Sequence, residues 1–255
     1  MKRVAVPAAL GVALMVLPLA GLLQHAPWSN LWTELASDQG LAALRLSLVC
    51  SLGALGVALV LGVPLAWVLA RVPFPGRALV RALVTLPMVL PPVVGGVGLL
   101  GVFGRRGFLG RHFGSWPGFP LPFTTRGVVL AQAFVAMPFL VVAAEAGLRQ
   151  LDARYEDAAA TLGAGPWRRF RTVTLPLVAP SLAAGAALCW ARALGEFGAT
   201  ITFAGSLPGR TRTLPTAIYA DLQTRPDAAV ALSVVLLGMS LAVLVALRGR
   251  WLGAR

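Results

Sequence analysis

The sequence predicts an all-α protein that crosses a lipid bilayer about six times. Hydrophobic residues make up 58% of the 255 residues and charged residues only 12%, whereas roughly 25% of a soluble domain is charged. The apolar residues also gather in six long runs, and a hydrocarbon core about 30 Å thick needs about 20 helical residues to span it. Composition and arrangement together therefore indicate a polytopic membrane protein that forms one domain, residues 1–255.

Each apolar run should form a helix, because unpaired backbone groups are costly in lipid. The alternating pattern of a transmembrane β-barrel is absent from the runs. The expected spans cover residues 4–23, 46–69, 79–103, 127–148, 182–203 and 228–247.

The first run follows Lys2 and Arg3, as the core of a secretory signal peptide would. Its 20 apolar residues are long for such a core, and no A-x-A cleavage site follows closely. We therefore expect the run to be retained, with cleavage as the alternative. Six spans place both termini on one side, and the bias of Lys and Arg toward the loops of that side predicts that both termini are cytoplasmic. The Arg-rich loop 104–126 opposes this bias, and its many Gly and Pro residues predict an irregular structure.

The third run contains Pro91 and Pro92, which should break or kink its helix. A broken helix at membrane depth is tolerated where it faces protein or a water-filled cavity. Pro91, Pro92, Gly95 and Gly96 therefore either line a pathway or belong to a plain kinked packing helix. The sequence from Gly96 to Gly101 matches G-x-G-x-x-G, but a dinucleotide site would need a preceding strand, and here the motif lies inside a hydrophobic run.

Charged residues inside the runs are few. Arg192 and Glu196 stand four residues apart in the fifth run, so on one helix they would share a face and pair. Each would cost about 2.5–3.5 kcal/mol at the centre of a span. A structural ion pair, a role in gating and direct contact with an anion all remain open for them. Glu145 and Arg149 lie near the end of the fourth run, where snorkelling to the membrane surface explains them.

The segment 149–176 is expected to lie in the cytoplasm. Asp152 can cap a short helix that runs to Leu162, and Gly163 can end that helix. Pro166 suits the first turn of another helix. The small alanine face of the short helix could seat in a groove of another protein.

This segment resembles the EAA loop of permease subunits of bacterial ABC importers. That loop reads EAA, three residues, Gly, nine residues, Ile, one residue and Leu-Pro. The matching positions here are Asp157, Ala158, Ala159, Gly163, Val173, Leu175 and Pro176. Asp replaces Glu and Val replaces Ile, and the neighbouring Glu156 could substitute for the shorter carboxylate of Asp157. The resemblance implies the type I permease fold of ABC importers, with this loop as the coupling helix that docks on an ATPase subunit.

A second segment, from Gly195 to Tyr219, resembles molybdate permeases, with tungstate and sulfate/thiosulfate permeases as relatives. The resemblance implies a homodimer in the bacterial inner membrane, surrounded by lipid, that imports an oxyanion. Its implied partners are a dimer of ABC ATPase subunits and a periplasmic or lipid-anchored oxyanion-binding protein. Basic residues expected outside could steer an anion or dock that protein: Arg105, Arg106, Arg111, Arg210 and Arg212.

Several chemistries are disfavoured by what the sequence lacks. A P-loop needs a lysine after glycines, and the one lysine is Lys2; ATP and Mg²⁺ are therefore expected on the partner ATPase, with no cofactor in this chain and no enzyme activity of its own. Cys50 and Cys189 form no C-x-x-C pair, and both histidines fall in expected loops, so no metal site is predicted. The net charge of +13 is expected to serve membrane topology, and nucleic-acid binding is not predicted. An ATP-independent channel or secondary transporter remains as an alternative.

Overall fold

The computed structural model describes residues 2–114 and 119–251, and within these stretches every regular element is helical. The predicted all-α class is thus confirmed. Six helical segments are long and apolar enough to cross a membrane. They are Ala5–Gln24, Asp38–Arg71, Pro92–Phe113, Thr125–Gln150, Pro166–Leu194 and Pro226–Val245.

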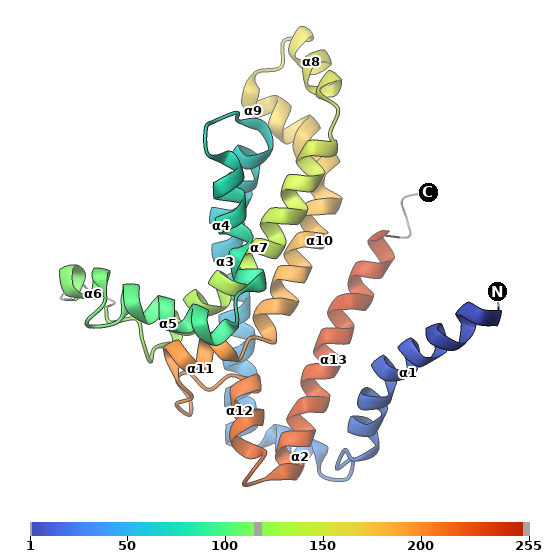
Figure 1. The fold of residues 1–255 in the computed structure, drawn as a ribbon, viewed down its shortest axis with the longest axis vertical. Coiled ribbons are helices and arrows are strands. Elements are labelled where there is room, and N and C mark those ends of the chain that lie inside the picture. The colour runs from blue at the N-terminus through green and yellow to red at the C-terminus, as the bar shows by residue number, and fades with distance from the viewer. Residues whose placement is uncertain (1, 115–118, 252–255) are drawn as a thin grey trace.

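Three long helices form the centre of the molecule: α3 (Asp38–Arg71), α7 (Thr125–Gln150) and α10 (Leu175–Leu194). They run side by side along the long axis (Figure 1). Ala54 and Ala58 of α3 are fully buried in one cluster with residues of α7 and α10. A Cβ at Gly62 would lie 3.2 Å from the side chain of Met137. These small residues let α3 approach α7 closely, as expected for a small-residue face.

The terminal helices lie to one side of this centre. The helix α1 (Lys2–Gln24) is followed by the short α2 (Leu31–Ala36), and α13 (Pro226–Trp251) ends the described chain. No residue of the apolar stretch of α1 is buried, and α1 contacts α13. Both terminal helices extend from the level of α2 toward the opposite end of the bundle (Figure 1).

The third expected span, 79–103, is two helices: α4 (Arg77–Val89) and α5 (Pro92–Phe103). The break predicted at Pro91 and Pro92 is present, and the membrane-length segment here is Pro92–Phe113. Leu90 and Pro91 are extended, with ψ of 135° and 129°, in keeping with the bias of a residue before proline away from the helical region. The chain then leaves the bundle axis through α5 and α6 (Phe108–Phe113) (Figure 1). The helix α6 lies in the loop expected to be irregular, whose residues 115–118 lie outside the described chain.

The fifth expected span, 182–203, is also divided. A helical path begins much earlier, with α9 (Pro166–Arg169) and the wide turn η1 (Phe170–Thr174), and continues into α10. It ends at Leu194, after which α11 (Gly198–Ala204) and α12 (Leu214–Asp221) follow. The last part of the expected loop 149–176 is therefore helical. Pro176 has no N–H to donate to the carbonyl of Thr172, which is consistent with a widened turn just before it.

Candidate coupling and pathway sites

The predicted short helix is present as α8 (Ala153–Thr161), which projects at one end of the bundle (Figure 1). The carboxylate of Asp152 accepts a hydrogen bond from the backbone N–H of Arg154 at 2.9 Å, which caps the helix. Gly163 has φ of +80° and ends it, a conformation that glycine adopts without steric cost. Both predicted ends are therefore confirmed, and Pro166 begins the next helix as expected.

Several residues of α8 and of the segment that follows it are exposed at this end of the bundle. Asp157 and Ala158 are exposed. Leu162 is 87% exposed and Trp167 is 71% exposed. Large apolar side chains in such an open position, beside a free carboxylate, suit a protein interface. Ala159 is half-buried, and Leu175 and Pro176 are exposed at the start of α10.

Glu156, the residue before Asp157 in α8, contacts the bundle. Its carboxylate accepts a hydrogen bond of 2.6 Å from the hydroxyl of Thr174 and lies 3.5 Å from the Arg71 guanidinium. The carboxylate of Glu156 is thus engaged within the chain, and its substitution for Asp157 in a contact with an ATPase stays a prediction. The outward carboxylate is that of Asp157.

The two helix breaks meet in the middle of the molecule. A Cβ at Gly198 would lie 2.9 Å from the Cβ of Pro92, and one at Gly96 would lie 2.6 Å from the Cβ of Thr202. Gly95 is equally confined, against the ring of Phe134. Gly95 and Gly96 are buried, whereas Pro91 is exposed. The glycines thus permit close packing of α5 on α7 and α11, and a pathway lined by Pro91, Pro92, Gly95 and Gly96 stays a prediction.

Arg192 and Glu196 form the predicted ion pair, with 2.6 Å between Nη1 and Oε2. The expectation that both residues share one face of a helix was wrong, because α10 ends at Leu194 and Glu196 lies beyond it. Glu196 is 1% exposed. Its second oxygen accepts a hydrogen bond of 2.8 Å from the backbone N–H of Ala199, in the first turn of α11. The carboxylate therefore joins the end of α10 to the beginning of α11.

A second buried carboxylate, Glu145, has a partner that sequence reasoning missed. Glu145 is 6% exposed, and the Nε of Arg81 in α4 donates to it at 3.0 Å. Arg149 lies 3.5 Å away. The snorkelling interpretation was wrong, because the partner that buries Glu145 comes from another helix, separated by 64 residues. No sequence spacing could have indicated this pair.

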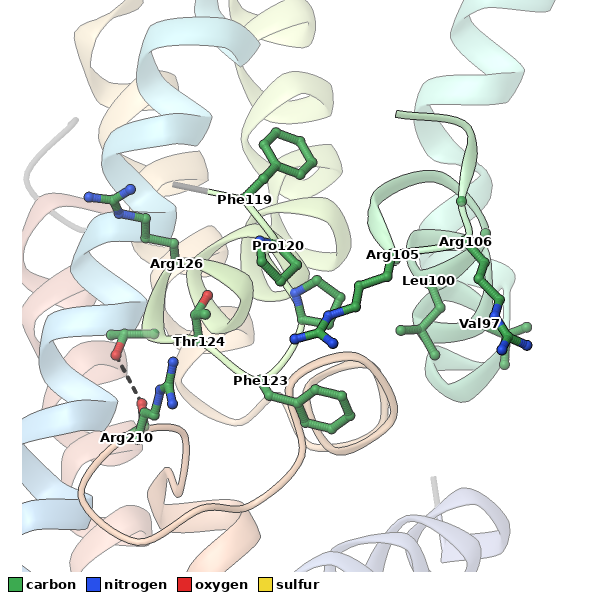
Figure 2. Close-up of a pocket in the computed structure, with 15 residues that line it drawn as sticks. Val97, Leu100, Arg105, Arg106, Phe119, Pro120, Phe123, Thr124, Arg126 and Arg210 are labelled. Atoms are coloured by element: carbon green, nitrogen blue, oxygen red, sulfur yellow. Dashed lines mark hydrogen bonds between the residues drawn. The ribbon is translucent and has the colours of Figure 1, made fainter. Parts of the chain in front are cut away.

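A cavity of about 1300 Å³ with a basic lining lies between α5 and the beginning of α7. Figure 2 shows Arg105, Arg126 and Arg210 around it, with Phe123 and Thr124 between them. The Thr125 hydroxyl donates to the carbonyl of Arg210 at 2.9 Å, which ties the loop after α11 to α7. None of the described residues that line the cavity is acidic. Four of its lining residues are arginines, namely Arg105, Arg106, Arg126 and Arg210.

Of the five basic residues expected to act together outside, two do not line this cavity. The Nε of Arg111 donates to the carbonyl of Arg106 at 2.8 Å, and that of Arg212 donates to the Ser206 hydroxyl at 3.2 Å. Elsewhere in the described chain, no three His, Cys, Asp or Glu side chains gather in an arrangement that could hold a metal ion.

The membrane-length helices, two of them broken where they meet, define a multi-pass membrane protein with a helix that projects at one end. The sequence model of binding-protein-dependent transport system inner membrane components matches residues 59–254. The chain belongs to this family.

Relatives and solved structures agree with this assignment. The molybdenum transport system permease protein ModB of Mycobacterium tuberculosis is 44% identical over 98% of this chain and 94% of its own length. ModB of Escherichia coli K12 is 44% identical over 85% of this chain and 94% of its own length. The sulfate transport system permease protein CysT of Escherichia coli K12 is 37% identical over 91% of this chain and 84% of its own length.

Among solved structures, a bacterial ABC transporter that imports the acidic polysaccharide alginate has a similar chain. The TM-score is 0.73 at 20% identity, over 100% of this chain and 98% of that chain. A chain of the methionine ABC transporter MetNI in an inward-facing conformation gives a TM-score of 0.55 at 18% identity, over 91% of this chain and 98% of that one. The predicted permease fold of ABC importers is confirmed.

Proposed function

We propose that this chain is the permease subunit of an ATP-driven importer whose substrate is molybdate. The observation that carries the proposal is the 44% identity to molybdenum permeases over 98% of the chain. Sulfate is the second candidate, because a sulfate permease is 37% identical over 91% of the chain. Tungstate, a tetrahedral oxyanion like molybdate, is the third.

The proposed assembly contains two copies of this chain in the bacterial inner membrane, two ATPase subunits and one periplasmic or lipid-anchored binding protein. ATP and Mg²⁺ would be held by the ATPase. The contact with the ATPase is assigned to α8 and the start of α10. Its residues would be Asp157, Ala158, Ala159, Gly163, Leu175 and Pro176. With α8 in the cytoplasm, both termini are cytoplasmic as well, in keeping with the direction of α1 and α13 (Figure 1).

The proposed cycle has two states that ATP biases. Closure of the ATPase dimer moves α8, and the pathway between the two permease copies opens outward to accept the oxyanion. Hydrolysis returns it to the inward state. Arg192 and Glu196 lie at the break between α10 and α11, so we assign them to the gate that closes the pathway. We assign the basic cavity to docking of an acidic surface of the binding protein, because the described residues of its lining include four arginines and no carboxylate.

The test is reconstitution of this chain with its ATPase and binding protein in proteoliposomes. ATP hydrolysis is then measured with molybdate, tungstate, sulfate and phosphate in turn. Stimulation by molybdate or tungstate alone, lost in Gly163→Pro, supports the importer and the coupling helix together. Stimulation by sulfate would keep the architecture and change the substrate. Transport without any ATPase would favour the channel or secondary transporter instead.

A further inference from the structure

One carboxylate holds together three segments that are far apart in the sequence. Glu156 belongs to α8, Arg71 is the last residue of α3, and Thr174 directly precedes α10. The Thr174 hydroxyl is 2.6 Å from Oε1 of Glu156, and Nη2 of Arg71 is 3.5 Å from Oε2. The Glu156 and Arg71 side chains are only 21% and 23% exposed. Their attraction is therefore less screened by water than that of a surface pair.

Apart from this contact, α8 has little to hold it. Its principal neighbours are α9 and η1, and none of its residues is buried. It connects to α9 through Leu162 to Gly165, a segment with two glycines. Without a fixed attachment, a helix on such a connection could tilt without moving the bundle. The Glu156 carboxylate supplies that attachment.

The neighbourhood of this contact is stiffened by aromatic rings. The ring of Phe170 stacks on Trp167, with centroids 5.7 Å apart, and meets Trp67 of α3 edge-on at 5.6 Å. A hollow of about 480 Å³ lies beside them and is lined by Glu156 and Arg169. Among the described residues that line the hollow, the charged ones are Glu156 and Arg169, and the Arg71 guanidinium lies 3.5 Å from the Glu156 carboxylate.

The contact of Glu156 with Thr174 lies directly before α10, so a movement of α8 can be transmitted to that helix. The helix α10 runs from Leu175 to Leu194, and the next residues lead to the buried carboxylate of Glu196. A helix of 20 residues is about 30 Å long. A displacement applied at Thr174 is therefore delivered, along a rigid element, to the break between α10 and α11.

We propose that Glu156 is a positioning residue for ATP-driven transport: held by Arg71 and Thr174, it makes α8 move as one body with the ends of α3 and α10. Asp157, the next residue of α8, would face the ATPase, whereas Glu156 passes the movement inward. This inference rests on the proposed coupling role of α8.

The test compares single and double variants in the complete reconstituted complex. Glu156→Gln removes the charge but keeps an oxygen that can accept from Thr174. Arg71→Gln removes the other charge, and Arg45→Gln makes the same substitution at an exposed position of α3. For each variant, co-elution with the ATPase reports assembly, and the ratio of oxyanion transported to ATP hydrolysed reports coupling.

We expect Glu156→Gln and Arg71→Gln to assemble normally while their transport ratio falls by roughly fivefold or more, the lower end of coupling between sites. The double variant should be no worse than either single one, because both remove the same interaction. Arg71→Lys should recover most of the ratio, and Arg45→Gln should leave it unchanged.

A normal ratio in assembled Glu156→Gln and Arg71→Gln would overturn the inference. So would additive losses in the double variant, because the two residues would then act separately. If Glu156→Gln failed to assemble, comparison of Arg71→Gln with Arg71→Lys would decide the question. Failure of the proposed function is distinguishable, because the unaltered complex would itself show no coupling of hydrolysis to transport.

Discussion

Gly198 lies directly against Pro92, so that a Cβ at Gly198 would be 2.9 Å from the Cβ of Pro92 and 3.3 Å from the backbone nitrogen of Val93. The break between α4 and α5 is thereby packed on the break between α10 and α11. Each break interrupts an apolar run that could otherwise have formed one straight helix. Their contact places two interruptions of membrane helices side by side.

Substitution of Gly96 tests this packing. Gly96→Ala is expected to destabilise the protein by about 1–3 kcal/mol, as overpacking does, because its Cβ would meet the Cβ of Thr202 at 2.6 Å. Gly98→Ala is the matched control in the same helix, since nothing lies within 4 Å of its Cβ position. Thermal unfolding of the purified protein in detergent measures both. Equal midpoints for the two variants would contradict the packing described here.

Replacing Arg192 alone should lower the free energy of unfolding more than replacing Arg192 and Glu196 together. Arg192→Ala leaves a buried carboxylate without its cation, and loss of one partner of a buried pair costs roughly 3–5 kcal/mol. The double variant Arg192→Ala/Glu196→Gln should recover part of that loss, because a neutral amide can still accept from the N–H of Ala199. Unfolding measurements on the three proteins check the order. Unchanged transport by Arg192→Ala would remove its proposed role in gating.

The end of α8 depends on the backbone of Gly163. Gly163→Ala should cost about 1 kcal/mol, because a residue with a Cβ is strained at positive φ. Binding to the ATPase should weaken accordingly. Gly165→Ala is the control, because Gly165 has φ of −64° and open space around it. A pull-down of the ATPase by each variant measures the effect, and equal weakening in both would mean that φ at Gly163 is unimportant.

Gln132 is fully buried in α7, and neither atom of its side-chain amide has a hydrogen-bond partner among residues 2–114 and 119–251. An unsatisfied buried polar group costs about 1–3 kcal/mol. Gln132→Met, which has a similar volume, should therefore leave the unfolding midpoint unchanged or raise it. A lower midpoint would show that the amide has a partner in the native membrane complex. A loss of transport at unchanged stability would instead assign Gln132 to the pathway.

Much of the helical architecture was predictable from local patterns. The apolar runs and the length of the hydrocarbon core indicated the membrane helices, and Pro91 with Pro92 indicated the break in the third. Asp152 and Gly163 marked the ends of α8, because capping and positive φ are properties of a few neighbouring residues. The division of the fifth run was missed, since residues 182–203 contain no proline and the charges of Arg192 and Glu196 were interpreted as a pair on one helix.

The sequence by itself determined the class of protein, the number of membrane helices and the segment that resembles a coupling loop, because these depend on composition and on residues near one another in the chain. Only the tertiary structure decided which carboxylates are free. Glu156 is held by Arg71 and Thr174, and Glu145 by Arg81. Asp157 is left exposed. The reason is physical. An ion pair forms where folding brings two side chains together, and the number of residues between them in the sequence does not give their distance in space.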